Sequence, residues 1–190
     1  ARTVSADLFQ PWQVTAGAWL RLTRRLGLGF DVAFARWSEF ESPAALVSVK
    51  LDLGPALNAV VPVAPPRVYP PSGFHDLLIP RLGLEWRAVE RDRIGLDVRA
   101  GYTWEPSPVP DQIGESNHAD GDKHTLSAGA GLTLERLADF LPRGLSLDAH
   151  LALTLMARRE ARKADPTDAV GDWVAEGKIL AGGLTLRMAF

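Results

Sequence analysis

Hydrophobic and polar residues alternate along most of the chain with a period of two, which is the pattern of β-strands rather than of helices. The stretch from Leu180 to Phe190 shows it most clearly. Its even positions are mostly large and apolar, whereas its odd positions hold small residues, Thr185 and Arg187. The pattern predicts an all-β protein whose strands have one apolar and one polar face. The same alternation recurs in Val14–Leu22, Leu26–Phe34, Leu82–Trp86, Ile94–Trp104, Thr125–Leu134 and Leu145–Leu155.

The composition of the two faces favours an antiparallel transmembrane β-barrel over a soluble sandwich. The polar face of a soluble sheet is usually rich in Lys, Glu and Thr. Here that face is dominated by Gly, Ala, Ser and Thr with isolated charges, which suits a narrow lumen. The apolar face ends repeatedly in aromatic residues, as the girdles at membrane interfaces do. These residues are Trp12, Trp86, Tyr102, Trp104, Trp173 and Phe190.

The connections between the strands differ in length, as they do in bacterial barrels with short periplasmic turns and long outer loops. The joins at Thr23–Leu26 and Val89–Arg93 are short, and Glu135–Gly144 is intermediate. The long joins are Gly54–His75, Glu105–His124 and Ala157–Asp172.

The number of membrane crossings depends on the run Leu46–Leu53, which also alternates. We interpret it as a continuation of the second strand beyond the membrane, which gives about seven crossings. If it is a separate crossing, the count becomes about eight and a small closed barrel is possible. Since single-chain bacterial barrels have even strand numbers, an odd count predicts that strands are missing.

Composition excludes several classes of protein. The chain has 190 residues, a net charge of -2 and no cysteine. We therefore expect no general attraction to nucleic acid, no disulfide and no thiolate metal site. No stretch approaches the roughly 20 apolar residues that a transmembrane helix needs. The chain begins at Ala1 without a signal-peptide pattern, and we expect it to be a single domain, residues 1–190, cut from a longer protein.

Several stretches resemble a known family. A strand ending in Gly101–Trp104 leads into a Ser-Pro-Val-Pro-Asp-Gln loop, then into Asp120–His124 and the strand beginning Leu126–Gly129. Ala35–Phe40 contains a Trp-Ser-x-Phe motif, and Glu176–Lys178 precedes the final strand. In this order the landmarks resemble the FadL family of outer-membrane transporters for long-chain fatty acids and aromatic hydrocarbons. The chain departs from the family at Ala119, where Pro is usual, and at Lys123 and His124, where Arg is usual.

The resemblance implies a fold, a location and a function. It covers the C-terminal half of a fourteen-stranded barrel, without the N-terminal hatch and the first strands. It implies a Gram-negative outer-membrane channel for passive uptake of hydrophobic compounds, long-chain fatty acids or aromatic hydrocarbons, with no cofactor and no catalysis. The expected partners are outer-membrane lipids, a hydrophobic small-molecule ligand and the barrel-assembly machinery, which would read the terminal Phe190.

Three sets of residues are candidates for function. The charged residues expected to face the lumen would either pair with one another or bind a carboxylate through Arg81, Arg99 or Arg187; they are Asp31, Arg81, Glu85, Arg87, Asp97, Arg99, Asp148 and Arg187. The loop motif that resembles the family is Ser107, Pro108, Val109, Pro110, Asp111 and Gln112. Apolar residues that could form an entrance for hydrophobic ligands are Val60, Val61, Val63 and Tyr69.

Other interpretations remain open. The protein could be a small structural or surface-interaction barrel, serving adhesion or as a phage receptor, with a closed lumen filled by salt bridges. The segment from His118 to His124 suggests a metal site, but it fits a solvated outer loop better. His150, Asp148 and Ser146 share a face and suggest a hydrolase, but no nucleophile elbow supports one.

Overall fold

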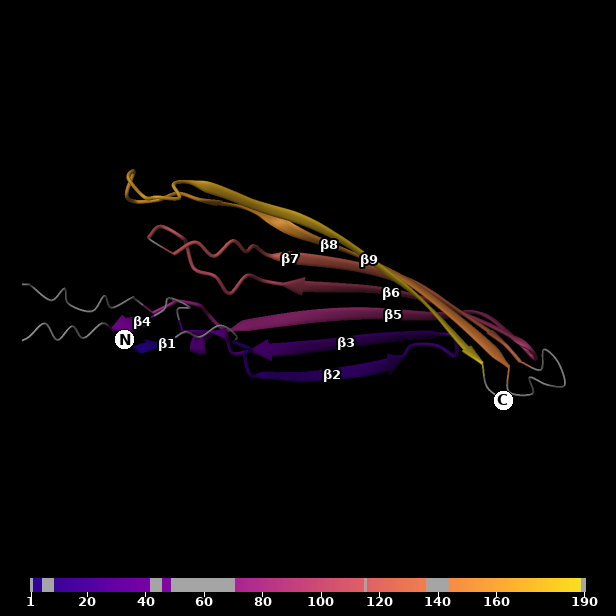
Figure 1. Ribbon diagram of the computed structural model, residues 1–190. Coiled ribbons are helices and arrows are strands. Elements are labelled where there is room, and N and C mark those ends of the chain that lie inside the picture. The colour runs from indigo at the N-terminus through magenta and orange to yellow at the C-terminus, as the bar shows by residue number, and fades with distance from the viewer. Residues whose placement is uncertain are drawn as a thin grey trace, which may run out of the picture.

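The structure is a computed structural model that describes residues 2–4, 9–41, 46–48, 71–114, 116–135 and 144–188. Its main element is a seven-stranded antiparallel sheet in the order β2-β3-β5-β6-β7-β8-β9 (Figure 1). The strands are β2 Gln13–Arg21, β3 Leu26–Ala35, β5 Leu77–Arg91, β6 Ile94–Glu105, β7 Lys123–Leu134, β8 Leu145–Ala161 and β9 Trp173–Met188. The all-β antiparallel fold predicted from the alternation is confirmed.

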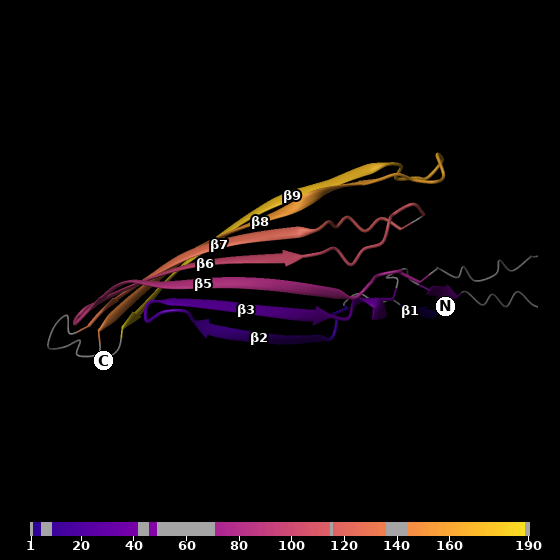
Figure 2. The same ribbon diagram turned by 180° about the vertical axis from the view of Figure 1, so that it is seen from behind.

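Each strand of this sheet pairs with the next long strand in the chain, so the topology is a simple meander. Both views show the strands side by side in one twisted sheet, with β2 at one edge and β9 at the other (Figures 1 and 2). Among the described residues, β2 pairs only with β3 and β9 only with β8, so the sheet is open. Seven strands with two open edges are what one half of a fourteen-stranded barrel would present.

A second, two-stranded sheet corrects one prediction. β4, Leu46–Ser48, pairs with β1, Arg2–Val4, and takes no part in the large sheet. The described part of the run, Leu46–Ser48, is therefore neither an unbroken continuation of β3 nor a separate strand of the large sheet, which has the seven strands that we preferred. The reason is local: β3 ends at Ala35, and the short 3-10 helix η1, Trp37–Glu39, follows and turns the chain away.

Three strands are longer than the alternation suggested. β9 begins at Trp173, so Glu176–Lys178 lie within the final strand rather than before it. β5 begins at Leu77 rather than at Leu82, even though it contains Pro80. Pro80 is paired with Val32 of β3. The pairing of β5 with β6 begins only at the next residue, Arg81, so the missing N–H of Pro80 costs no hydrogen bond to β6. β8 continues past a shift in register between Met156 and Arg159, so the loop expected to start at Ala157 begins after Ala161.

The two ends of the sheet differ. One end, called the loop end below, carries η1 and the long connections 106–122 and 162–172 (Figure 1). The other, the turn end, carries the short connections 22–25 and 92–93. Within the described residues, no helix is long and apolar enough to cross a membrane.

The register gives the sheet one continuous apolar face. Phe30 on β3 lies opposite Leu82 on β5, which in turn lies opposite Tyr102 on β6. At the far edge, Leu180 and Leu184 of β9 are 73% and 70% exposed. Large apolar side chains that stand this far out of the protein need a non-aqueous environment or a partner surface.

Candidate functional site

The opposite face, called the polar face below, collects the charged side chains of several strands. Asp31 on β3 lies opposite Arg81 on β5, and their side chains approach to 3.3 Å. Further toward the turn end, Nε of Arg87 donates a hydrogen bond to Oδ1 of Asp97 at 3.0 Å. The pairs connect neighbouring strands because cross-strand partners point to the same side of a sheet.

Arg99 is the centre of the largest ion-pair group on this face. Its Nε donates to Oε2 of Glu85 at 2.9 Å, and its Nη1 donates to Oδ1 of Asp148 at 3.1 Å. Arg99 stands on β6, Glu85 on β5 and Asp148 on β8, so the guanidinium also reaches across β7. Each of these side chains is about a third to a half exposed, and such pairs stabilise a protein by about 0–1 kcal/mol each.

Gly131 on β7 allows Arg99 to reach Asp148. A Cβ at this position would lie 2.5 Å from Oδ1 of Asp148 and 3.2 Å from Nη1 of Arg99. Any larger residue would therefore push the two charged groups apart. The sequence shows a glycine here but gives no hint that a salt bridge passes over it.

Arg187 differs from the other charged residues predicted for this face. Within the part of the chain that the structure describes, it is the member of that set without an ion pair. It lines a hollow of about 340 Å³ together with Arg99, Asp148, Ser146 and Thr185. The structure thus brings the predicted charged set to one side of the sheet.

At the loop end the same face changes from charged to apolar. Ala33 and Ala35 of β3 lie beside Leu77 and Ile79 of β5, and each of these side chains is at least 95% buried. Trp37 of η1 packs against them. The face therefore has an apolar floor near its loop end and an ion-pair group further along.

A cluster of aromatic rings stands at the loop end beside this floor. It joins Phe9, Trp37, Phe40, Phe74 and His118, which come from segments far apart in the sequence. The shortest distance between ring centroids is 4.6 Å, between Phe40 and Phe74, and the His118 ring meets Phe74 edge-on at 5.1 Å. Burial among these rings lowers the pKa of His118 below its usual value of 6.5.

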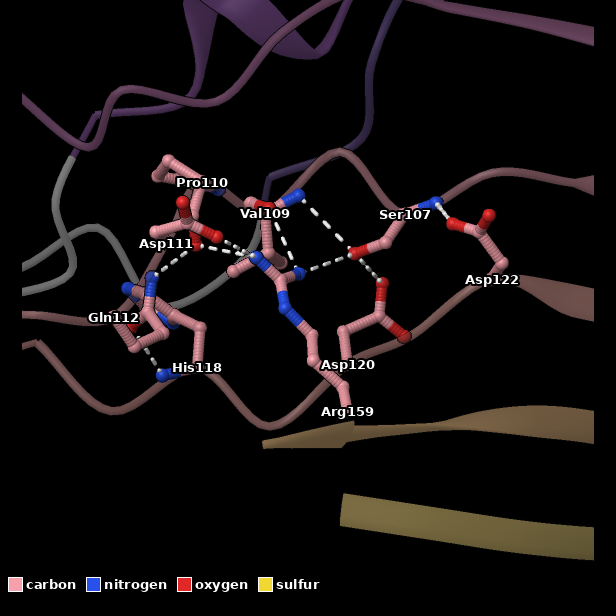
Figure 3. Close-up of polar contacts among 9 residues, drawn as sticks. All are labelled: Ser107, Val109, Pro110, Asp111, Gln112, His118, Asp120, Asp122 and Arg159. Carbon is pink, nitrogen blue, oxygen red and sulfur yellow. Dashed lines mark hydrogen bonds and ion pairs between the residues drawn. The ribbon is translucent and has the colours of Figure 1, made fainter. Parts of the chain in front are cut away.

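The loop motif that resembles the family is held by a residue that the sequence did not single out, Arg159 of β8. Figure 3 shows its guanidinium pointing into the loop. Nη1 donates to the carbonyl oxygen of Val109 at 2.9 Å, and Nη2 donates to that of Pro110 at 2.8 Å. Weaker contacts reach Oγ of Ser107 at 3.3 Å and Oδ1 of Asp111 at 3.4 Å.

Two carboxylates and an amide complete the fixing of this loop (Figure 3). The backbone N–H of Ser107 donates to Asp122 at 2.9 Å, and its hydroxyl donates to Asp120 at 2.9 Å. The Gln112 side chain is buried, with its Nε2 donating to the carbonyl of Pro110 and its Oε1 accepting from the N–H of His118. These bonds fasten the motif to the end of β8, and the loop Ser107–Gln112 together with Arg159 is called the brace below.

The neighbouring loop is fastened to the first. Nζ of Lys163 donates to the carbonyl oxygens of Gly114 at 2.6 Å and Ser116 at 2.8 Å. The brace also borders a hollow of about 460 Å³, lined among others by His75, Asp122 and Arg158. These bonds join the two loops, so the loops can move separately only if the bonds are broken.

The remaining predicted sites have different outcomes. Val60, Val61, Val63, Tyr69 and Phe190 lie outside the described residues. In the part that is described, no group of His, Asp and Glu side chains is arranged to hold a metal ion. His150 lies over Gly183 of β9, and no nucleophile–base contact with Ser146 is present among the described residues. Sequence analysis missed Arg159 because the run Ala157–Asp172 was predicted to be a loop. It also missed the ring cluster, because nothing in the sequence indicates that Phe9, Phe74 and His118 lie close together.

Comparisons with known proteins agree with this geometry. Alkane uptake protein A of Marinobacter nauticus is 28% identical over 188 residues, which covers 95% of this chain and 37% of that protein. A crystal structure of a Pseudomonas aeruginosa FadL homologue superposes with a TM-score of 0.56 at 15% identity, over 93% of this chain and 34% of that one. The chain has a FadL-like fold. No protein-family profile matches it.

The chain covers little more than a third of the length of these two proteins. The likeness to the solved structure establishes the fold, and the partial coverage fits an open sheet that forms part of a larger barrel. The short stretches that resemble the family, above all the Ser107–Gln112 loop, therefore pointed to the right fold.

Proposed function

We propose that this chain is part of an outer-membrane β-barrel that takes up hydrophobic compounds passively. The observation that carries the proposal is the division of the sheet into an exposed apolar face and a face with an ion-pair group. Exposed Leu180 and Leu184 fit lipid tails, whereas Arg99 with Glu85 and Asp148 fits a polar interior. The likeness to a protein named for alkane uptake supports hydrophobic compounds as the cargo.

The loop end fits a route for apolar molecules. The rings of Trp37, Phe40 and Phe74 are partly exposed beside the buried floor of Ala33, Ala35, Leu77 and Ile79, and they offer an apolar surface to a ligand. The proposed movement is passive, down the concentration gradient of the compound. Long-chain fatty acids, aromatic hydrocarbons and alkanes are all apolar enough to use it.

The experiment uses the full-length protein that contains this chain, reconstituted in lipid vesicles without an energy source. Radiolabelled hexadecane, toluene and palmitate are offered separately, and their entry is compared with that into empty vesicles. We expect faster equilibration of at least one compound and no accumulation above equilibrium. Rates equal to those of empty vesicles for all three would contradict the proposal.

A second candidate, a structural or surface-interaction barrel with a closed interior, is favoured by the ion-pair group. Arg99, Glu85, Asp148, Asp97 and Arg87 form a connected set on the polar face, and such sets fill small closed barrels. The uptake experiment separates the two, because a closed barrel passes none of the three compounds.

A further inference from the structure

Near the turn end, β2 places an aromatic ring on the polar face. Gly17 lies opposite Asp31, which belongs to the charged set, and Trp19 follows two positions later, opposite Gly29. Since alternate residues of a strand point to the same side of the sheet, the Trp19 side chain stands on the side of Asp31. It is 56% exposed. Trp19 is thus an accessible apolar surface on the face that carries the ion pairs.

The ring lies over the backbone of β3, where two glycines leave room for it. A Cβ at Gly27 would overlap Cζ2 of Trp19, and a Cβ at Gly29 would lie 3.0 Å from Cε3. One side of the ring therefore rests on the strand and the other faces away from it. On the next strand Gly83 is the partner of Gly29, and no atom lies within 4 Å of where its Cβ would be. The described residues thus leave space beside the ring for a ligand.

Arg21 follows on the same side of β2 and lies opposite Gly27. Its side chain is exposed and makes no ion pair or hydrogen bond within the part of the chain that the structure describes. Glu85 of β5 lies on the other side of Gly27, but Arg99 already holds its carboxylate at 2.9 Å. Arg21 therefore offers a guanidinium group that its described neighbours do not neutralise.

Trp19 and Arg21 line one hollow of about 200 Å³ on the polar face. Four arginines border this hollow against two glutamates, Glu85 and Glu90. Both glutamates have partners, since Glu90 lies 3.8 Å from Arg87 and Glu85 is bound to Arg99. The hollow therefore combines an excess of positive charge with an apolar ring, and both belong to the same side of the sheet. A ligand that fits it has an anionic group joined to an apolar body.

The turn that follows Arg21 is held in a fixed shape. Oγ1 of Thr23 accepts hydrogen bonds from the N–H groups of Arg25 at 3.1 Å and Leu26 at 3.0 Å. The carbonyl oxygen of Arg25 accepts one from the N–H of Arg87 on β5 at 2.7 Å. A fixed backbone reduces the entropy that is lost when the arginine side chains close on a ligand.

We propose that this hollow binds a hydrophobic carboxylic acid, with the carboxylate on Arg21 and the adjoining apolar chain on the ring of Trp19. Arginine is suited to this because its planar guanidinium donates two parallel hydrogen bonds to a carboxylate. The inference rests on the proposed function and narrows its cargo, since a neutral hydrocarbon gives Arg21 no partner. Short turns of outer-membrane barrels lie on the periplasmic side, so the site would hold the acid where it leaves the barrel.

The test maps where a photoactivatable ligand reacts with the full-length protein in phosphatidylcholine vesicles. The probes are palmitate with a diazirine near its carboxyl group and the matching hexadecanol. After irradiation, mass spectrometry compares labelling at Trp19 with labelling at Leu20, which stands on the apolar face and counts molecules in the bilayer. We expect the ratio of Trp19 to Leu20 labelling to be roughly fivefold higher for the acid than for the alcohol, the effect of one exposed ion pair.

Two variants locate the effect at the guanidinium group. Arg21→Gln should lower the ratio for palmitate to that for hexadecanol. Arg93→Gln removes an equal charge from the turn between β5 and β6, outside the residues that line the hollow, and should keep the wild-type ratio.

Four results would overturn the inference: no label at Trp19 in the wild type, equal ratios for the acid and the alcohol, an unchanged ratio in Arg21→Gln, or an equal loss in both variants. Uptake by the wild-type protein is scored separately, so each of these results leaves the proposed function standing. Conversely, acid-dependent label at Trp19 without any uptake would support the site and contradict the channel.

Discussion

At the scale of single residues, glycine decides where charged side chains can meet on the polar face. Gly131 leaves room for the contact of Arg99 with Asp148, while Gly83, also on the polar face, has no atom within 4 Å of where its Cβ would be. The two glycines occupy similar strand positions but different surroundings. They therefore make a matched pair for testing whether the ion-pair group stabilises the fold.

We predict that Gly131→Ala lowers the free energy of unfolding of the full-length protein by about 1 kcal/mol, the value of a partly exposed ion pair together with local strain. Gly83→Ala should be neutral or slightly stabilising, since alanine restricts the unfolded chain. Urea unfolding in lipid vesicles, followed by tryptophan fluorescence, measures both. Equal effects of the two variants would show that the Arg99 contact contributes nothing.

Arg159 provides a second test at this scale, because its donors meet the carbonyl oxygens of Val109 and Pro110. Arg159→Ala should lower the local free energy of opening of the brace by about 2 kcal/mol, as for hydrogen bonds that involve a charged group. Hydrogen exchange at the N–H groups of Ser107 and Val109 reports this directly. Arg158→Ala is the control, since Arg158 is 60% exposed and pairs with Glu160; the same acceleration in both variants would remove Arg159 from this role.

At the scale of elements, the packing of the loop end joins segments that are distant in sequence. The ring cluster connects residues before β2, after β3 and before β5 with His118 in the connection 106–122. Protonation of His118 would place a charge among these rings where it is partly removed from water, which opposes the packing.

We therefore predict that acid loosens the loop end. The pKa of His118 is lowered on folding, so the unfolded chain binds the proton more readily and the stabilisation present above pH 6.5 is lost as the pH falls through the folded-state pKa. An NMR titration of the His118 ring in the full-length protein should give a midpoint below 6.5. His118→Phe should abolish the acid-induced change at Phe74, and a midpoint at or above 6.5 would contradict the prediction.

The strands were predictable from sequence to different degrees, for physical reasons. The alternation located the centres of β3, β6, β7 and β9, because a strand with one apolar and one polar face leaves a period of two in the sequence. For β5 the predicted strand was too short, because a proline without an N–H usually ends a strand. Here Pro80 lies outside the pairing of β5 with β6, so the strand continues through it. The predicted β8 was too short because the period of two is interrupted at its register shift.

The candidate site was predictable only in part. The charges on the polar face follow from the same alternation, so Asp31, Arg81 and Arg99 were found. The brace made by Arg159 and the contact of Phe74 with His118 depend on how loops fold over the sheet. Neither spacing nor composition encodes such contacts between distant segments.

At the scale of the whole molecule, the open sheet has to be completed. The edges at β2 and β9 leave backbone groups that are unpaired within the described residues, and exposed strand edges promote aggregation in water and are excluded from lipid. Strands from the rest of a longer protein would satisfy both edges at once. The apolar face would then form a continuous outer surface around the barrel.

The most direct test of this account is site-directed spin labelling along β9 in the full-length protein, reconstituted in lipid bilayers and freed of other cysteines. Labels at Leu180, Leu184 and Leu186 should be accessible to oxygen, which concentrates in lipid, and labels at Ala181, Gly183 and Thr185 to a water-soluble nickel complex. The account predicts that the two accessibilities alternate with a period of two, in opposite phase. Uniform accessibility to the nickel complex along the strand would contradict it, because the apolar face would then meet water rather than lipid.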